Sequence, residues 1–172
     1  MIRACYIFLV LAASVMIETK LGSLGVVIPL AAMSVYYFSM MQGWRIGLAL
    51  GFAAGLAVDM LYGREVPVST LGFMAVSGVT VFWLLKGETK DYLLHVVPGL
   101  LTGLVAVIPV VALYWKDMML GGVEDILSVP LSSVVSAAVI LPVLIFCLDA
   151  VSEWLGMELY RNARENIEER MQ

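Results

Sequence analysis

The sequence predicts an all-α polytopic membrane protein that folds as a compact bundle of six transmembrane helices. Hydrophobic residues make up 62% of the 172 residues and charged residues only 14%, and the mean hydropathy is +0.97. Soluble globular domains carry about 25% charged and about 45–50% apolar residues. Six apolar segments follow one another with very short connections, which leave no room for a soluble domain between them.

The first two predicted spans precede the glycine-rich part of the chain. Residues 2–17 combine one arginine, an apolar core and small residues, a pattern that signal peptides also show. We interpret this segment as a membrane span, the shortest of the six, which ends at Glu18, Thr19 and Lys20. The second span is predicted over residues 21–41.

The remaining predicted spans are close to the about 20 apolar residues that a crossing helix needs. Because most connections are short, neighbours in the sequence run antiparallel and pack side by side. The four remaining spans cover residues 44–62, 66–85, 93–115 and 127–148. Together, the six spans form a transmembrane domain that extends over residues 1–155.

Two polar segments lie outside the predicted spans. Residues 116–126 mix apolar and charged side chains, so this connection is expected either to lie in the membrane interface or to offer a docking surface. Residues 156–172 are expected to form a cytoplasmic polar helical tail, in which Arg and Glu recur at i,i+4 spacing. A solvated extension of the sixth span and a partner-binding helix are both open interpretations of this tail.

The placement of Lys and Arg predicts the orientation, because cytoplasmic loops carry an excess of these residues. With the N-terminus inside, the outer side holds only Lys20, Arg64 and Lys116. Both termini are therefore predicted to be cytoplasmic. The cytoplasmic side then holds Arg3, Arg45, Lys86, Lys90, Arg161, Arg164 and Arg170.

Small residues recur every fourth position in the third predicted span. An i,i+4 row forms one ridge of a helix, and glycine at each position turns that ridge into a groove. A neighbouring helix can then bring its backbone close, as small-xxx-small motifs allow. The predicted packing residues are Gly47, Gly51, Gly55, Asp59 and Gly63, preceded by Gly43.

Asp59 is the one carboxylate in this row. A charged side chain at the centre of a bilayer costs about 3 kcal/mol on insertion scales, and less near an interface. Asp59 stands one turn before Gly63 and so lies toward the outer leaflet. Three uses remain open for it: a hydrogen bond to the turn after Gly63, an ion pair with Arg64, or contact with a ligand.

Residues 51–63, GFAAGLAVDMLYG, fit the pattern G-F-x-x-G-x-x-x-D-x-x-x-G. In this stretch the chain resembles the MreD family of bacterial rod shape-determining membrane proteins. The length, the six spans, Pro29 in the second span and the serines before a proline in the sixth agree with the resemblance. One departure is Pro67, which stands where the family usually has another glycine, so the turn between spans three and four is expected to differ.

The resemblance implies a non-catalytic scaffold or regulator in the bacterial inner membrane. MreD-like proteins pair with the bitopic protein MreC. Through it they join the RodA glycosyltransferase, a class B penicillin-binding protein and MreB filaments in the elongation complex. That complex inserts peptidoglycan along the side wall of rod-shaped cells.

A small-molecule transporter subunit is the main alternative. Substrate-binding components of energy-coupling-factor vitamin transporters are similar in length and in their six-span plan. A vitamin site needs converging polar and aromatic side chains near the outer face. Asp59, Tyr62, Trp83 and Trp115 are the candidates, although Trp and Tyr at span ends are more often interfacial anchors.

Catalytic chemistry is not expected, and no metal, cofactor or nucleic acid is predicted to bind. The single histidine, His95, is interpreted as an interfacial residue at the start of span five. The predicted topology separates Asp59 from Asp149, so they do not form an aspartyl pair. Two sets of residues are assigned to packing: Ser132, Ser133 and Ser136 as hydrogen-bonding groups between helices, and Cys5 and Cys147 as small buried hydrophobes.

Overall fold

The computed structural model describes residues 2–85, 95–121 and 123–157, and all regular structure in these ranges is helical. The predicted all-α class is confirmed for this part of the chain. Four of the helices, α1, α3, α5 and α6, are long and apolar enough to cross a membrane. The helices are α1 (Ile2–Ser23), α2 (Leu30–Gln42), α3 (Trp44–Leu61), α4 (Val68–Leu85), α5 (Val96–Gly121) and α6 (Val123–Trp154).

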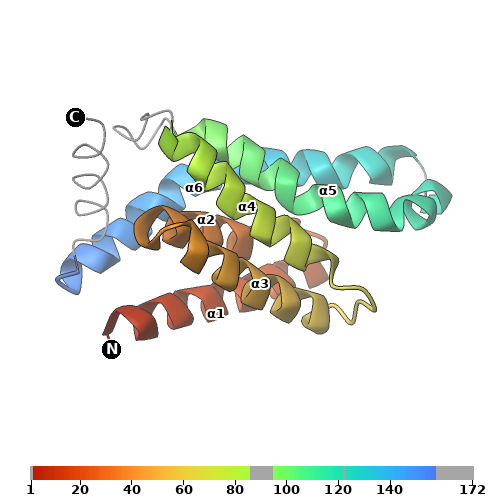
Figure 1. Cartoon of the computed structure of the whole chain (residues 1–172). Helices are drawn as coiled ribbons and strands as arrows, with labels where there is room; N and C mark the ends of the chain where they lie inside the picture. The colour runs from red at the N-terminus through yellow and green to blue at the C-terminus, as the bar shows by residue number, and fades with distance from the viewer. Residues whose placement is uncertain (1, 86–94, 122, 158–172) are drawn as a thin grey trace.

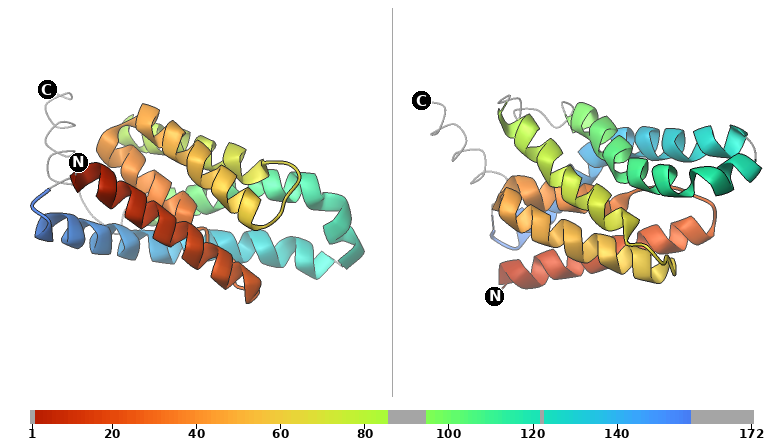
Figure 2. Two further views of the ribbon diagram at one scale, coloured as in Figure 1. Left: turned by 90° about the horizontal axis from the view of Figure 1, so that it is seen from below. Right: turned by 45° about the vertical axis from the view of Figure 1, so that its right-hand side comes forward.

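Successive helices run in alternating directions, so α1 begins and α6 ends at the same end of the bundle (Figures 1 and 2). The most extensive contacts join α5 to α6 and α3 to α4. At the opposite end, the α5–α6 hairpin projects beyond the other helices (Figure 1). The predicted tail over residues 156–172 lies outside the described residues except at its first two positions.

The second helix is the centre of the bundle. α2 contacts α1, α3, α4, α5 and α6, and every residue from Ala31 to Met40 is buried. It has only 13 residues, which makes it about 20 Å long. The second predicted span, residues 21–41, is therefore wrong at its start: α1 extends to Ser23, and a non-helical segment precedes α2. Pro29 ends that segment because proline is disfavoured in a helix interior but accepted at a helix start.

The predicted connection over residues 116–126 is mostly helical. α5 continues to Gly121 and α6 begins at Val123, so almost the whole segment is helical. Lys, Met and Leu in this segment are good helix formers, and their propensity favours extending both helices beyond the apolar stretch. Proline lies inside α5 at Pro109 and inside α6 at Pro130 and Pro142. Helices in membranes tolerate such prolines because neighbouring groups satisfy the freed carbonyls.

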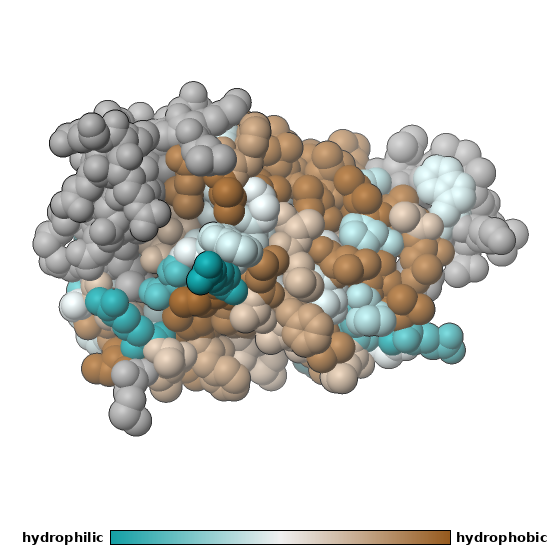
Figure 3. Space-filling model, viewed as in Figure 1, coloured by the Kyte–Doolittle hydropathy of each residue, from teal (hydrophilic) through white to brown (hydrophobic). Residues whose placement is uncertain are grey.

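The outer surface is largely apolar. Hydrophobic side chains cover much of the coloured part of the face in Figure 3. Large ones such as Phe8 and Met60 are each 70% exposed. Soluble monomers rarely expose apolar patches above a few hundred Å², so this surface is compatible with a multi-pass membrane protein. Cys5 and Cys147 are both free thiols on this surface. The prediction that they are buried is wrong, because each faces outward from its helix.

Candidate functional site

The glycine row of α3 lies against the backbone of α4. A Cβ atom added at Gly51 would lie 2.7 Å from the carbonyl oxygen of Phe73, and one at Gly55 would lie 2.6 Å from the amide nitrogen of Thr70. Real Cβ contacts are essentially never that short, so no side chain fits between the two helices at these positions. Gly47 differs, because it faces the hydroxyl groups of Ser39 and Ser77, which hydrogen-bond to each other at 3.2 Å.

Glycines on two other helices make comparable contacts that sequence reasoning missed. Cβ atoms at Gly99 and Gly103 of α5 would each lie 2.7 Å from a carbonyl oxygen of α6. A Cβ at Gly72 of α4 would lie 2.9 Å from the carbonyl oxygen of Ala106 on α5. The spacing of Gly99 and Gly103 is the same small-xxx-small signal as in α3. Glycines therefore mediate each of the successive contacts from α3 through α6.

Asp59, at the last turn of α3, binds the first turn of α4. Its Oδ1 accepts hydrogen bonds from the Ser69 amide at 3.1 Å and from Arg64 Nη1 at 3.0 Å. Its Oδ2 accepts from the amide of Thr70 at 3.2 Å and from the Thr70 hydroxyl at 3.4 Å. The first amides of a helix have no partner within the helix, and they favour a carboxylate. Asp59 is only 2% exposed, and these donors compensate for the burial of its charge.

Arg64 is held in place by three neighbours. Besides Asp59, Nη1 donates to the Ser69 hydroxyl, and the guanidinium carbon lies 4.8 Å from the centre of the Tyr62 ring. Gly63 makes this turn possible with a φ of +64°, which side chains rarely adopt. The turn closes with a hydrogen bond from the Arg64 amide to the Asp59 carbonyl at 2.9 Å. Pro67 ends the turn immediately before α4 begins at Val68.

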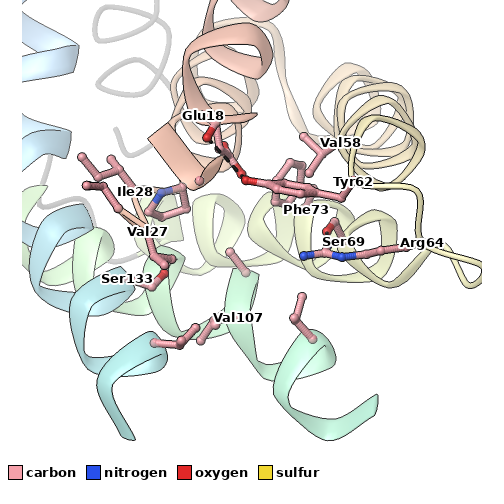
Figure 4. Close-up of a pocket in the computed structure, with 16 residues that line it drawn as sticks. Glu18, Val27, Ile28, Val58, Tyr62, Arg64, Ser69, Phe73, Val107 and Ser133 are labelled. Atoms are coloured by element: carbon pink, nitrogen blue, oxygen red, sulfur yellow. Dashed lines mark hydrogen bonds between the residues drawn. The ribbon is translucent and has the colours of Figure 1, made fainter. Parts of the chain in front are cut away.

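A cavity of about 210 Å³ lies beside Arg64, at the end of the bundle where α1 ends and α4 begins. Its walls come from α1, the non-helical segment before α2, the α3–α4 turn, and helices α5 and α6 (Figure 4). Valine and isoleucine form much of the lining. The polar lining groups are Glu18, Tyr62, Arg64, Ser69 and Ser133.

Glu18 is a site residue that sequence reasoning missed. Its Oε2 accepts a hydrogen bond from the Ala31 amide at 2.7 Å, so a carboxylate from α1 caps the N-terminus of α2. The Tyr62 hydroxyl donates to the Glu18 carbonyl at 3.4 Å (Figure 4). In the sequence, Glu18 stands at the end of the first predicted span, where acidic residues are common. In the structure, the non-helical segment before α2 places the start of α2 beside Glu18.

A second hollow lies on the outer surface between α1 and α3. This α1–α3 groove has a volume of about 520 Å³ and contains no polar side chain among its lining residues. It runs along α1 from Ala4 to Met16, about 18 Å at helical rise. Small residues form part of both walls, namely Ala4, Ala12, Ala53, Ala54 and Ala57.

The other sequence-predicted residues are not brought together. His95 is completely buried, and its Nδ1 lies 3.3 Å from the Tyr36 hydroxyl, so its interpretation as an interfacial residue is wrong. Trp83 lies near the opposite end of α4 from the cavity, and Trp115 is exposed and does not line it.

Two of the three predicted serines hydrogen-bond outside α6. The Ser133 hydroxyl donates to the Gly103 carbonyl of α5 at 3.3 Å, and that of Ser136 donates to the Val27 carbonyl at 3.2 Å. Ser132 instead donates to the Val129 carbonyl of its own helix. The Ser136 contact ties α6 to the non-helical segment before α2.

Comparison with models of protein families, with curated proteins and with solved structures finds no match. Within the described ranges, no group of three or more His, Cys, Asp or Glu side chains is placed to hold a metal ion. Over the described residues the fold defines the class of protein: it is all-helical, with four helices long and apolar enough to span a membrane.

Proposed function

We propose that this protein is a non-catalytic scaffold or regulator of the MreD type in a bacterial inner membrane. In this proposal it binds an MreC-like bitopic partner and, through it, supports the RodA-like glycosyltransferase, the class B penicillin-binding protein and MreB in side-wall peptidoglycan synthesis. The α1–α3 groove is the observation that carries the proposal.

The proposal includes six membrane crossings. The four long helices account for four of them, and α4, with 18 residues, is about 27 Å long. α2 is too short for the about 30 Å of a bilayer core. Residues 26–29 add about 13 Å in extended form, so this segment and α2 together provide the length of a crossing. Non-helical backbone is acceptable at that depth where it is buried in protein or lines a cavity.

The α1–α3 groove fits an apolar helix of a single-span partner. In lipid, helices gain no hydrophobic driving force from association, so affinity depends on close packing against small residues. Alanines on both walls of the groove allow this approach along most of α1. A bitopic partner of the MreC type, which crosses the membrane with one helix, meets this requirement.

Filling the groove tests the proposal. Ala53 is exposed in the groove, and Ala75 is an alanine on α4 that is also exposed but does not line it. Ala53→Leu is expected to reduce co-purification of an MreC-like partner at least about fivefold, because overpacking costs about 1–3 kcal/mol. Ala75→Leu is the matched control and is expected to leave recovery unchanged. Equal recovery with both variants at equal membrane abundance contradicts the groove as the docking site.

The cavity supports a second candidate function, the substrate-binding component of a vitamin transporter. Tyr62 and Arg64 line it, and Asp59 holds Arg64 in place. Native mass spectrometry of the purified protein distinguishes the two functions. Retention of a vitamin-sized molecule favours transport, whereas co-purification with a bitopic partner favours the scaffold.

A further inference from the structure

The cavity contains polar groups whose hydrogen-bonding capacity is only partly used. Glu18 accepts through Oε2, while Oε1 accepts from no described residue. Arg64 donates through Nη1, while Nε and Nη2 donate to none. The amides of Val27 and Ile28, two residues that line the cavity, likewise have no acceptor within the described residues.

The residues that carry these groups are half-buried. A polar group that is partly removed from water is destabilising when it lacks a hydrogen-bond partner, and a charged group more so. Asp59 neutralises the charge of Arg64 but contacts only one of its terminal nitrogens, so the other donors of the guanidinium remain available. Water or a ligand must satisfy them. The valine and isoleucine walls favour a ligand with an apolar part.

The arrangement of charge selects the ligand class. Glu18 approaches from α1 and Arg64 from the α3–α4 turn, with Tyr62 between them (Figure 4). Glu18 needs a donor, whereas Arg64 and the free amides need an acceptor. A simple anion leaves the Glu18 carboxylate unpaired, and a simple cation leaves the remaining N–H donors of Arg64 without an acceptor. A ligand that carries both an ammonium and an anionic oxygen group satisfies both walls.

We propose that this cavity binds a zwitterion, with its primary ammonium on Glu18 and its anionic oxygen group on Arg64. Two sources supply this chemistry: the ethanolamine headgroup of a membrane phospholipid, whose acyl chains remain in the bilayer, and a free amino acid with an aliphatic side chain. The site is independent of partner binding in the α1–α3 groove, because the two share no lining residue.

Two arms of one experiment distinguish the sources. In the lipid arm, the full chain is placed in bilayers that contain phosphatidylethanolamine and phosphatidylcholine, and retained lipid is measured by native mass spectrometry. The two headgroups carry the same charges, but the trimethylated one has no N–H to donate. In the free arm, L-leucine binding is measured by calorimetry in detergent without phospholipid. Preference for phosphatidylethanolamine identifies the lipid as the source, and leucine binding identifies the free zwitterion.

Matched variants locate the bound molecule. Glu18→Gln keeps an oxygen for the Ala31 amide and removes the charge, so the capped fold is retained while binding falls about tenfold, the scale of one hydrogen bond to a charged group. Val107→Phe fills the cavity without changing charge and is expected to reduce binding as well. Glu153→Gln, on an exposed side chain of α6, is the control.

Either of two outcomes overturns the proposal. The first is equal retention of the two phospholipids together with no leucine binding. The second is binding by Glu18→Gln and Val107→Phe that equals that of the wild-type protein.

Discussion

Asp59 connects two helices through one side chain. Its carboxylate lies on α3, yet three of its four hydrogen-bond donors belong to Ser69 and Thr70 of α4, and the fourth is Arg64 in the turn between them. A carboxylate at a helix N-terminus is stabilised both by the free amides and by the helix dipole. Of the three uses that the sequence left open, the ion pair with Arg64 occurs here. The other hydrogen bonds of the Asp59 carboxylate reach the first turn of α4 and not the backbone of the turn after Gly63.

Substitutions at Asp59 separate charge from hydrogen bonding. Asp59→Asn retains one acceptor oxygen but removes the charge that balances Arg64, whereas Asp59→Leu removes both. We expect Asp59→Leu to destabilise the bundle by about 3–5 kcal/mol, because one partner of a buried pair is lost. Asp59→Asn is expected to cost less. The midpoint of thermal unfolding in detergent, followed by circular dichroism, measures both. Equal destabilisation would mean that the charge, and not the hydrogen bonds, is what α4 requires.

The close contacts between helices in this protein occur where glycine leaves a helix surface without side chains, so that the backbone of a neighbouring helix can approach. In the α3–α4 contact, Gly51 and Gly55 both face α4 backbone. Backbone cannot move aside as a flexible side chain can. Even one methyl group at these positions must therefore push the two helices apart. This separation would also move the Asp59 carboxylate away from the Ser69 and Thr70 amides that donate to it.

A pair of Gly→Ala substitutions tests this contact with an internal control. A Cβ at Gly55 would lie 2.6 Å from the Thr70 amide nitrogen, whereas one at Gly78 would meet nothing within 4 Å. We expect Gly55→Ala to destabilise by about 1–3 kcal/mol through overpacking. Gly78→Ala is expected to be neutral or to stabilise by up to about 1 kcal/mol through helix propensity. Chemical denaturation monitored by circular dichroism measures both, and equal stabilities would contradict close packing at Gly55.

The short central helix depends on its capping carboxylate. α2 is buried from Ala31 to Met40, so lipid and water do not reach its side chains. Its start lacks a side-chain cap from its own sequence, since Pro29 occupies the N-cap position. Glu18 supplies that cap from α1. The same carboxylate thus anchors the core and lines the cavity.

At the scale of the whole molecule, the alternating helices place the two chain ends together. α1 begins and α6 ends at one end of the bundle, and the cavity lies toward the other (Figure 2). In the proposed orientation, the first end is cytoplasmic and the cavity opens toward the outside. Lys20 and Arg64 then lie on the outer side, and Arg3 and Arg45 on the inner side, in agreement with the charge bias.

Cysteine labelling tests this orientation. Cys5 and Cys147 are both exposed, so each is first replaced by Ser. Single cysteines are then introduced at Leu24, 77% exposed between α1 and α2, and at the exposed Glu153 near the end of α6. An impermeant thiol reagent is expected to label Leu24→Cys in intact spheroplasts and Glu153→Cys only after permeabilisation. The reverse pattern would invert the orientation.

The sequence by itself determined the features that depend on local composition. Long apolar segments predicted membrane-crossing helices because only internally hydrogen-bonded backbone is stable in lipid. The bounds of α3 were nearly correct, since Gly43 and Gly63 mark both of its ends. The row from Gly47 to Asp59 stood out for the same reason: its spacing is periodic along one helix face.

Only the tertiary structure decided what depends on residues that are distant in the sequence. Pro29 marks the start of α2 locally, but the carboxylate that accepts from the Ala31 amide belongs to Glu18, 13 positions earlier, and no local pattern carries that pairing. His95 is buried because it meets Tyr36, 59 positions away. The cavity also depends on distant residues, because Glu18 comes from α1 and Arg64 from the α3–α4 turn, and the two meet only in the folded bundle. Hydropathy measures the preference of each segment for lipid, whereas these features arise from how the segments pack against one another.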